Sequence, residues 1–266
     1  TSEKLGIRSD SSKRFENGIS DSLVESGLYM TINLIKEICP SVKVGVITDE
    51  YKNKETPYFV GVSLNELNSI LGSNYTNDEV ENTLKNLSFK YEKIIPENYI
   101  KDLYPKLIGA KYKNPSSMRY DAPESFSCSS LVSYLYKGIW MPSISIDKYV
   151  FAEKIEEKDL RFGDLVFANG GMGKIYTETI EFLRGTKVSN GIDHVAMYLG
   201  NESIIHAKKT EKKVVIESLD DFAKNMKFVA YGRIVADLNE ERYVVEIPLE
   251  RLDIRIKEDL AEEIGR

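Results

Sequence analysis

Residues 124–136, ESFSCSSLVSYLY, decide how the rest of the chain is interpreted. Cys128 lies among small polar residues, and the apolar residues Leu131, Val132 and Leu135 that follow it have the spacing of one helix face. This pattern predicts a helix that begins at Cys128. The free backbone N–H groups and the positive end of a helix dipole stabilise a thiolate, which is the form of sulfur that attacks carbonyl carbons.

Both histidines of the chain lie downstream of this helix, His194 in GIDHVAMYLG and His206 in ESIIHAKK. Each histidine is in a short apolar segment, and Gly200 and Asn201 separate the two segments, which predicts a β-hairpin. The hairpin would bring both rings to neighbouring strands, where one imidazole can orient the other. A lone cysteine is more often a small buried hydrophobic residue. A cysteine with two histidines indicates a nucleophile, a base and a residue that orients the base.

The composition is that of a soluble globular protein with one large or two ordinary domains: 266 residues, 42% hydrophobic and 29% charged. No apolar run reaches the roughly 20 residues that span a bilayer, and the N-terminal stretch lacks the apolar region of a signal peptide. We therefore expect a cytoplasmic protein without a membrane partner. The net charge of −6 argues against broad electrostatic binding of nucleic acid. Cys39 has no partner at a metal-type spacing, and we expect it to be buried and inert.

Short helices and strands are predicted on the N-terminal side of this region. Their signals are apolar periodicity, capping boxes and a glycine at a helix end. The predicted helices cover residues 21–39, 64–72 and 76–87, and the predicted strands cover residues 42–48, 58–64 and 89–94.

Three stretches resemble the β subunit of phenylalanyl-tRNA synthetase. LGIRSDSSKRFENGIS (5–20) is similar to the end of its editing-type module, and VSLNELNSILGSNYTNDEVENTLKNLSFKYE (62–92) is similar to the start of the next module. YVVEIPLERLDIRIKEDLAEEIGR (243–266) is similar to the end of that same module. The resemblance predicts an editing-type segment at 1–60 and a small helix-turn-helix-like module, split between 61–93 and 243–266, around an insertion at 94–242.

The resemblance also implies a role for the parent protein. It would support the charging of tRNA with phenylalanine, with the synthetase α subunit and tRNA as partners. The chain begins and ends inside the family pattern, so we expect a fragment that cannot charge tRNA by itself.

The insertion has the order of elements of a papain-like α+β domain, a helix followed by antiparallel strands. It resembles the NlpC-type cysteine peptidases in four stretches: SCSSLV (127–132), FGDLVF (162–167), HVAMYLG (194–200) and IHA (205–207). The resemblance implies that Cys128 is the nucleophile, His194 the base and His206 the residue that orients it. It also places Tyr112 near the oxyanion site. The implied reaction is hydrolysis of amide bonds in small peptides, without a cofactor.

Two positions depart from the NlpC-type pattern. Ser127 stands where the family has an aspartate that shapes the pocket for a substrate amine, and Ser130 stands where the family has a glycine. A catalytically idle insertion, serving as an interaction or scaffolding module, therefore remains the alternative to a working hydrolase. Residues 168–193 form a longer connection than relatives have, and we expect a surface helix there rather than a lid over the cleft.

A metal site is also expected near the C-terminus. Asp259, Glu262 and Glu263 lie on one face of a predicted helix, and Asp253 precedes them. Oxygen ligands of this kind suit magnesium, and the synthetase resemblance implies a magnesium site at these positions. A solvated acidic helix face is the other interpretation.

Overall fold

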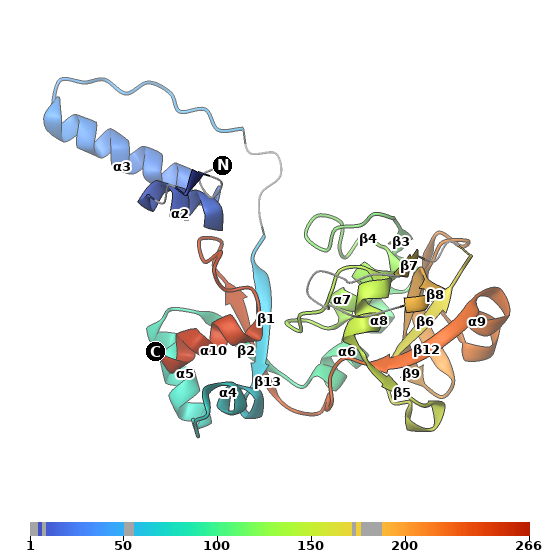
Figure 1. Ribbon diagram of the computed structural model, residues 1–266. Helices are drawn as coiled ribbons and strands as arrows, with labels where there is room; N and C mark the ends of the chain where they lie inside the picture. Colours follow the sequence, from blue (N-terminus) through green and yellow to red (C-terminus); the bar gives the residue numbers. More distant parts are fainter. Residues whose placement is uncertain (1–4, 7–8, 51–55, 172–173, 177–187) are drawn as a thin grey trace.

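Two helices at the N-terminus stand apart from both sheets of the molecule. The computed structural model describes all residues except 1–4, 7–8, 51–55, 172–173 and 177–187. Helices α2 (Asp10–Asn17) and α3 (Leu23–Ile38) come first and are blue in Figure 1. The helix predicted at 21–39 is confirmed, although none of its residues is buried. No described helix is long and apolar enough to cross a membrane.

Two predictions for the segment after α3 are wrong. Residues 42–48 form no strand and are exposed, with Val46 at 96%. A strand needs a hydrogen-bonding neighbour, and none of the described strands lies beside this segment. Cys39 is exposed rather than buried, because the apolar face of α3 contacts no buried core in the described part of the chain.

A three-stranded antiparallel sheet joins the two ends of the chain. Its order is β1 (Tyr58–Ser63), β13 (Arg242–Ile247) and β2 (Lys90–Ile94). The central strand β13 thus comes from the C-terminal end and pairs with two strands that are far earlier in the sequence. The capping boxes at Ser63 and Thr76 and the left-handed cap at Gly72 fix the helices that follow, α4 (Leu64–Leu71) and α5 (Asn77–Asn86).

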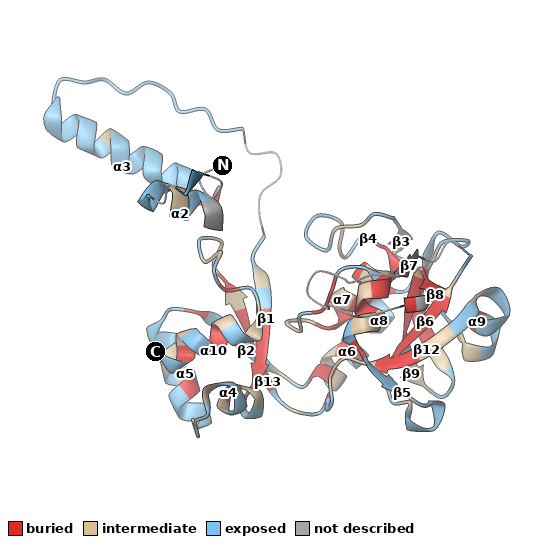
Figure 2. Ribbon diagram, viewed as in Figure 1, coloured by how far each residue is buried: buried red, intermediate tan, exposed pale blue. Residues whose placement is uncertain are grey.

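One hydrophobic core lies between this sheet and three helices. Helix α10 (Lys257–Gly265) packs against α4, α5 and β1. The core contains Val62 and Val245 from the sheet and Leu67, Leu84 and Leu260 from the helices, all of them fully buried. Two segments separated by about 150 residues therefore share one core, shown in red around α10 in Figure 2.

Residues between β2 and β13 build a second, larger sheet. Its eight strands follow the order β4-β3-β11-β10-β9-β6-β12-β5, antiparallel except for the pair β3 and β4. The strands are β3 (Lys111–Tyr112), β4 (Ser125–Phe126), β5 (Glu153–Ile155), β6 (Leu165–Asn169), β9 (His194–Gly200), β10 (Ser203–Lys208), β11 (Lys213–Ser218) and β12 (Lys227–Arg233). A separate pair consists of β7 (Lys174–Tyr176) and β8 (Val188–Ile192). The helix expected within 168–193 falls largely on residues outside those described.

Among the described residues, four α-helices and a short 3-10 helix accompany the larger sheet: α6 (Pro96–Leu107), α7 (Cys128–Leu135), α8 (Ser145–Phe151), η1 (Glu157–Asp159) and α9 (Leu219–Asn225). Helix α7 packs against β9 and β10 through Leu131, Val132 and Leu135, which are fully buried. The predicted α+β arrangement, a helix on an antiparallel sheet, is confirmed (Figure 1).

The turn after α7 touches the smaller sheet. The Gly61 N–H on β1 donates a hydrogen bond of 2.6 Å to the Gly138 carbonyl oxygen. A Cβ at Gly61 would lie 3.0 Å from that oxygen, and Gly138 has a positive φ of 74°. Lys137 pairs with Glu92 of β2. The two cores are therefore joined through close backbone contact as well as through the chain connections.

Candidate active site

Cys128 is the first residue of α7, as the sequence predicts. A reciprocal capping box holds this end of the helix: the Ser127 hydroxyl accepts from the Ser130 N–H at 3.2 Å, and the Ser130 hydroxyl accepts from the Ser127 N–H at 2.9 Å. The two serines that depart from the NlpC-type pattern thus cap the N-terminus of α7. The sulfur lies at the positive end of the α7 dipole.

The two histidines meet across neighbouring strands. His194 is the first residue of β9, and His206 is on β10, which pairs with β9 in antiparallel orientation. The turn between them uses Asn201 and Glu202, which have positive φ values of 48° and 55°, the conformation of a tight hairpin turn. Nε2 of His194 lies 2.8 Å from Nδ1 of His206. The predicted hairpin is confirmed, with its turn one residue later than the predicted pair Gly200 and Asn201, and the two histidine rings are in direct contact.

The Cys128 sulfur lies in a polar setting inside an otherwise apolar core. The Ser145 hydroxyl of α8 is 3.5 Å away, and the Asp193 carbonyl oxygen is 3.8 Å away. Burial by itself would raise the pKa of the thiol. Hydrogen bonding and charge from His194 outweigh burial, with help from Ser145 and the Val195 N–H, and lower the pKa from 9.0 to about 7. A large fraction of Cys128 is therefore thiolate at neutral pH.

Glu217 on β11 completes this row of residues and was not predicted from the sequence. Its Oε1 lies 2.9 Å from Nε2 of His206, without the alignment of a hydrogen bond. Val215 pairs with His206 across β10 and β11, so Glu217, two residues on, is a diagonal neighbour on the same face. The sequence does show a carboxylate at the end of the apolar run KVVIES (213–218). It does not show the register between β10 and β11 that brings this carboxylate next to His206.

The His206 ring is neutral at physiological pH. Burial, the neighbouring His194 and the charge of Lys208 lower its pKa to about 3. Lys208 also pairs with Glu217, so the carboxylate is balanced by an ammonium group. We infer that the single ring proton of His206 is on Nε2, facing Glu217, and that Nδ1 accepts from His194. This arrangement leaves Nδ1 of His194 as the nitrogen available to the sulfur.

Tyr112 lies on β3, beside β4 and the start of α7. Its pKa is raised by burial and by the nearby charge of Cys128, which places the phenol in the electrostatic environment of the sulfur. The structure therefore brings Tyr112, Ser127, Cys128, His194 and His206 into one region of the fold.

The structure does not support the expected magnesium site. Asp253 binds Arg251 through both carboxylate oxygens, at 3.0 and 2.7 Å. Glu262 and Glu263 pair with Arg266. Among the residues that the structure describes, no group of three or more His, Cys, Asp or Glu side chains is placed to hold a metal ion.

Asp259 also has a local role in place of metal binding. Its Oδ2 accepts from the Ile256 N–H at 3.0 Å and from the Arg255 N–H at 2.7 Å. The carboxylate therefore holds the first turn of α10. Arginine partners and helix capping explain the acidic pattern of the C-terminal segment.

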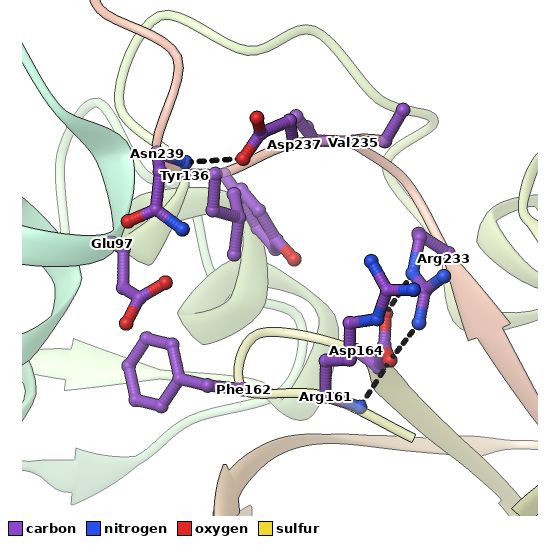
Figure 3. A pocket seen from close by; sticks show the side chains of 11 residues that line it. Glu97, Tyr136, Arg161, Phe162, Asp164, Arg233, Val235, Asp237 and Asn239 are labelled. Atoms are coloured by element: carbon purple, nitrogen blue, oxygen red, sulfur yellow. Dashed lines mark hydrogen bonds and ion pairs between the residues drawn. The ribbon is translucent and has the colours of Figure 1, made fainter. Parts of the chain in front are cut away.

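A hollow of about 80 Å³ lies elsewhere, between the start of α6 and the segment after β12 (Figure 3). Asp164 on its wall accepts from Arg233 Nε at 2.8 Å and from the Arg161 backbone N–H at 2.7 Å. None of Cys128, His194 and His206 lines this hollow. It is separate from the candidate active site.

Comparison with known proteins finds two kinds of similarity. Residues 115–233 match the model of the NlpC/P60 family. A "Probable endopeptidase p60" of Listeria seeligeri is 28% identical over 116 residues, 43% of this chain and 18% of that protein. The "Phenylalanine--tRNA ligase beta subunit" of Porphyromonas gingivalis is 31% identical over 93 residues, 35% of this chain and 11% of that protein. The chain thus spans less than a fifth of these relatives.

Among solved structures, NlpC2 from Trichomonas vaginalis is similar with a TM-score of 0.39 and 22% identity, covering 53% of this chain and 46% of that one. The family match at 115–233 includes Cys128, His194 and His206. The similarity to the ligase β subunit is partial.

Proposed function

We propose that residues 115–233, which match the NlpC/P60 family model, act as a cysteine hydrolase of amide bonds in small peptides. One observation carries the proposal: His194 lowers the pKa of the Cys128 thiol to about 7 despite burial, while His194 itself is held at 2.8 Å by His206. An inert buried cysteine would have a raised pKa. The name of the Listeria relative, an endopeptidase, supports a peptide substrate.

The reaction follows from the order of these groups. His194 takes the thiol proton of Cys128, and the thiolate attacks the amide carbonyl carbon. The negative charge that develops on the carbonyl oxygen is stabilised by the backbone N–H of Cys128 at the start of α7, with Tyr112 nearby. His194 gives its proton to the leaving amine, and a thioester remains on the sulfur. Water, deprotonated by His194, then releases the acid and restores the thiol.

His206 and Glu217 keep His194 in the tautomer that this reaction needs. When His194 is doubly protonated, its Nε2–H donates to Nδ1 of His206 and its other N–H faces the thiolate. His206 remains neutral because its pKa is about 3, so it does not compete for the proton.

The surroundings of Ser127 favour a substrate that has no free amino group next to the Ser127 hydroxyl. The Ser127 hydroxyl is neutral and is engaged with Ser130 at the start of α7. A carboxylate at the same position could pair with a substrate ammonium group, whereas a capping hydroxyl offers only a weak, uncharged contact. We propose that the substrate amide is distant from a free amino terminus.

We further propose that the hydrolase interrupts a module of a phenylalanyl-tRNA synthetase β-like subunit. The parent would act in the cytoplasm with the α subunit and tRNA, in support of phenylalanine charging. The proposed division is 1–60, 61–93 with 243–266, and 94–242. Support comes from the partial identity to the ligase β subunit and from β13, which pairs with β1 and β2 across the inserted residues.

The hydrolase proposal is tested with a panel of short peptides that contain ordinary and unusual amide linkages, including peptides with free and blocked amino termini. Products are identified by liquid chromatography and mass spectrometry. Cleavage should be lost in Cys128→Ala and retained in Cys39→Ala, the matched control at the other cysteine. Cleavage that persists in Cys128→Ala would remove this residue from the mechanism. Absence of cleavage and of thiolate reactivity in the unaltered chain would indicate an idle interaction module.

A further inference from the structure

Lys148 is a fully buried lysine that the proposed reaction does not use. It lies on α8 with 0% exposure. Burial lowers the pKa of its ammonium group to about 7, against the opposing effects of Cys128 and Asp147. Burying a group of this kind costs free energy unless it makes strong hydrogen bonds. The hydrogen bonds that compensate for the burial of Lys148 should therefore indicate its structural role.

The Lys148 amine connects three segments around the nucleophile. Nζ donates to the Ser133 hydroxyl of α7 at 2.6 Å and to the Pro142 carbonyl oxygen in the α7–α8 connection. Both bonds can be donated by the charged and by the neutral amine. The connection between α7 and α8 therefore persists on either side of the pKa of this group.

Ser145 lies one turn before Lys148, on the same face of α8. It is buried, and its hydroxyl lies 3.5 Å from the Cys128 sulfur. This hydroxyl helps to lower the pKa of the thiol. The position of α8 relative to α7 thus decides whether the Ser145 hydroxyl reaches the sulfur.

We propose that Lys148 is a positioning residue for Cys128: it holds α8 against α7 and so keeps the Ser145 hydroxyl at the sulfur. The proposal deepens the proposed function, on which it rests for the role of Cys128 as nucleophile. In the described part of the chain, His194 of β9, Tyr112 of β3 and Lys148 itself interact electrostatically with Cys128, and the charge of Asp193, whose carbonyl oxygen lies 3.8 Å from the sulfur, acts on Tyr112.

The test measures how fast iodoacetamide alkylates Cys128 between pH 5 and pH 10, followed by mass spectrometry of the intact chain. The midpoint of this profile reports the thiolate and needs no substrate. All variants carry Cys39→Ser, because Cys39 is exposed and would also react. Circular dichroism confirms that each variant is folded.

Lys148→Met keeps the length of the side chain and removes both hydrogen bonds. The midpoint should rise by about one unit, which is about tenfold less thiolate at pH 6. Ser133→Ala removes one acceptor and leaves Lys148 in place, so it should raise the midpoint by a smaller amount. Ser133→Ala is the deciding variant if Lys148→Met does not fold. Lys154→Met, which loses contacts to the Tyr149 and Ala152 carbonyl groups at the other end of α8, is the control and should leave the midpoint unchanged.

The route through Ser145 is tested by combining substitutions. Ser145→Ala should raise the midpoint, and adding Lys148→Met to it should change the midpoint little further, because both act on one contact. Full additivity, or an unchanged midpoint in the single variants at Lys148 and Ser133, would overturn the proposal. Peptide cleavage by the Cys39→Ser protein tests the hydrolase function separately, so a failure of the positioning proposal can be told apart from a failure of the hydrolase function.

Discussion

Replacing His194 by alanine should undo the activation of Cys128. In the folded chain, His194 outweighs burial and lowers the pKa of the thiol from 9.0 to about 7. Without the imidazole, burial acts with little opposition, so the pKa should be above 9. The change of about two units corresponds to about 2.7 kcal/mol of lost thiolate stabilisation. At pH 7 the thiolate fraction of Cys128 would fall about 50-fold.

The alkylation rate at a single pH would understate this change. A thiolate of higher pKa is intrinsically the better nucleophile, by about eightfold for two units at a Brønsted coefficient of about 0.45. The rate at pH 7 should therefore fall only about sixfold, while the midpoint of the pH profile moves from about 7 to above 9. We would measure this profile with iodoacetamide in a Cys39→Ser background. A midpoint that stays near 7 in a folded His194→Ala variant would refute the argument that His194 activates the sulfur.

Three further predictions concern His206, Glu217 and the inserted segment. Folding lowers the pKa of His206 from 6.5 to about 3, so the unfolded chain binds a proton on this ring more readily than the folded chain does. The free energy of unfolding should therefore fall as the pH drops below 6.5. Denaturant titrations should show about 2 kcal/mol lost at pH 5, and an unchanged pH dependence in His206→Asn would contradict this. Glu217→Gln should slow peptide cleavage by about tenfold, which corresponds to the free energy of one contact to a charged group. Full activity of this variant would show that the carboxylate does not fix the His206 ring. Ile94 and Arg242 are partners in the register of β2 and β13. Replacing residues 95–241 by Asn-Gly should therefore join the two strands as a hairpin and leave a folded small module. A shortened chain that is unfolded by circular dichroism would contradict the split-module proposal.

The local structure around the nucleophile could be predicted because it depends on neighbouring residues. Helix α7 begins at Cys128 because of its capping serines and apolar spacing, and the β9–β10 hairpin follows from two apolar runs with a short turn between them. Short-range signals of this kind succeed here because they agree with the packing of the surrounding fold. The contact between His194 and His206 followed directly from that hairpin.

Features that depend on distant partners could not be predicted. Strand propensity at Val42 had no effect, because no described strand pairs with that segment. The C-terminal carboxylates resembled a metal site until the structure showed Arg251 and Arg266 beside them. Glu217 and Lys148 were missed for the same reason, since the first depends on strand register and the second on how α8 packs against α7.

The central claim is that the Cys128 sulfur attacks the carbonyl carbon of an amide. The most direct measurement is an acid quench of the Cys39→Ser chain during turnover of a cleaved peptide, followed by peptide mapping. We predict a thioester adduct, with the mass of the acyl half of the substrate, on the fragment that contains Cys128, and neither adduct nor cleavage in Cys128→Ala. Cleavage at an undiminished rate in Cys128→Ala, or an adduct located on another residue, would contradict the account.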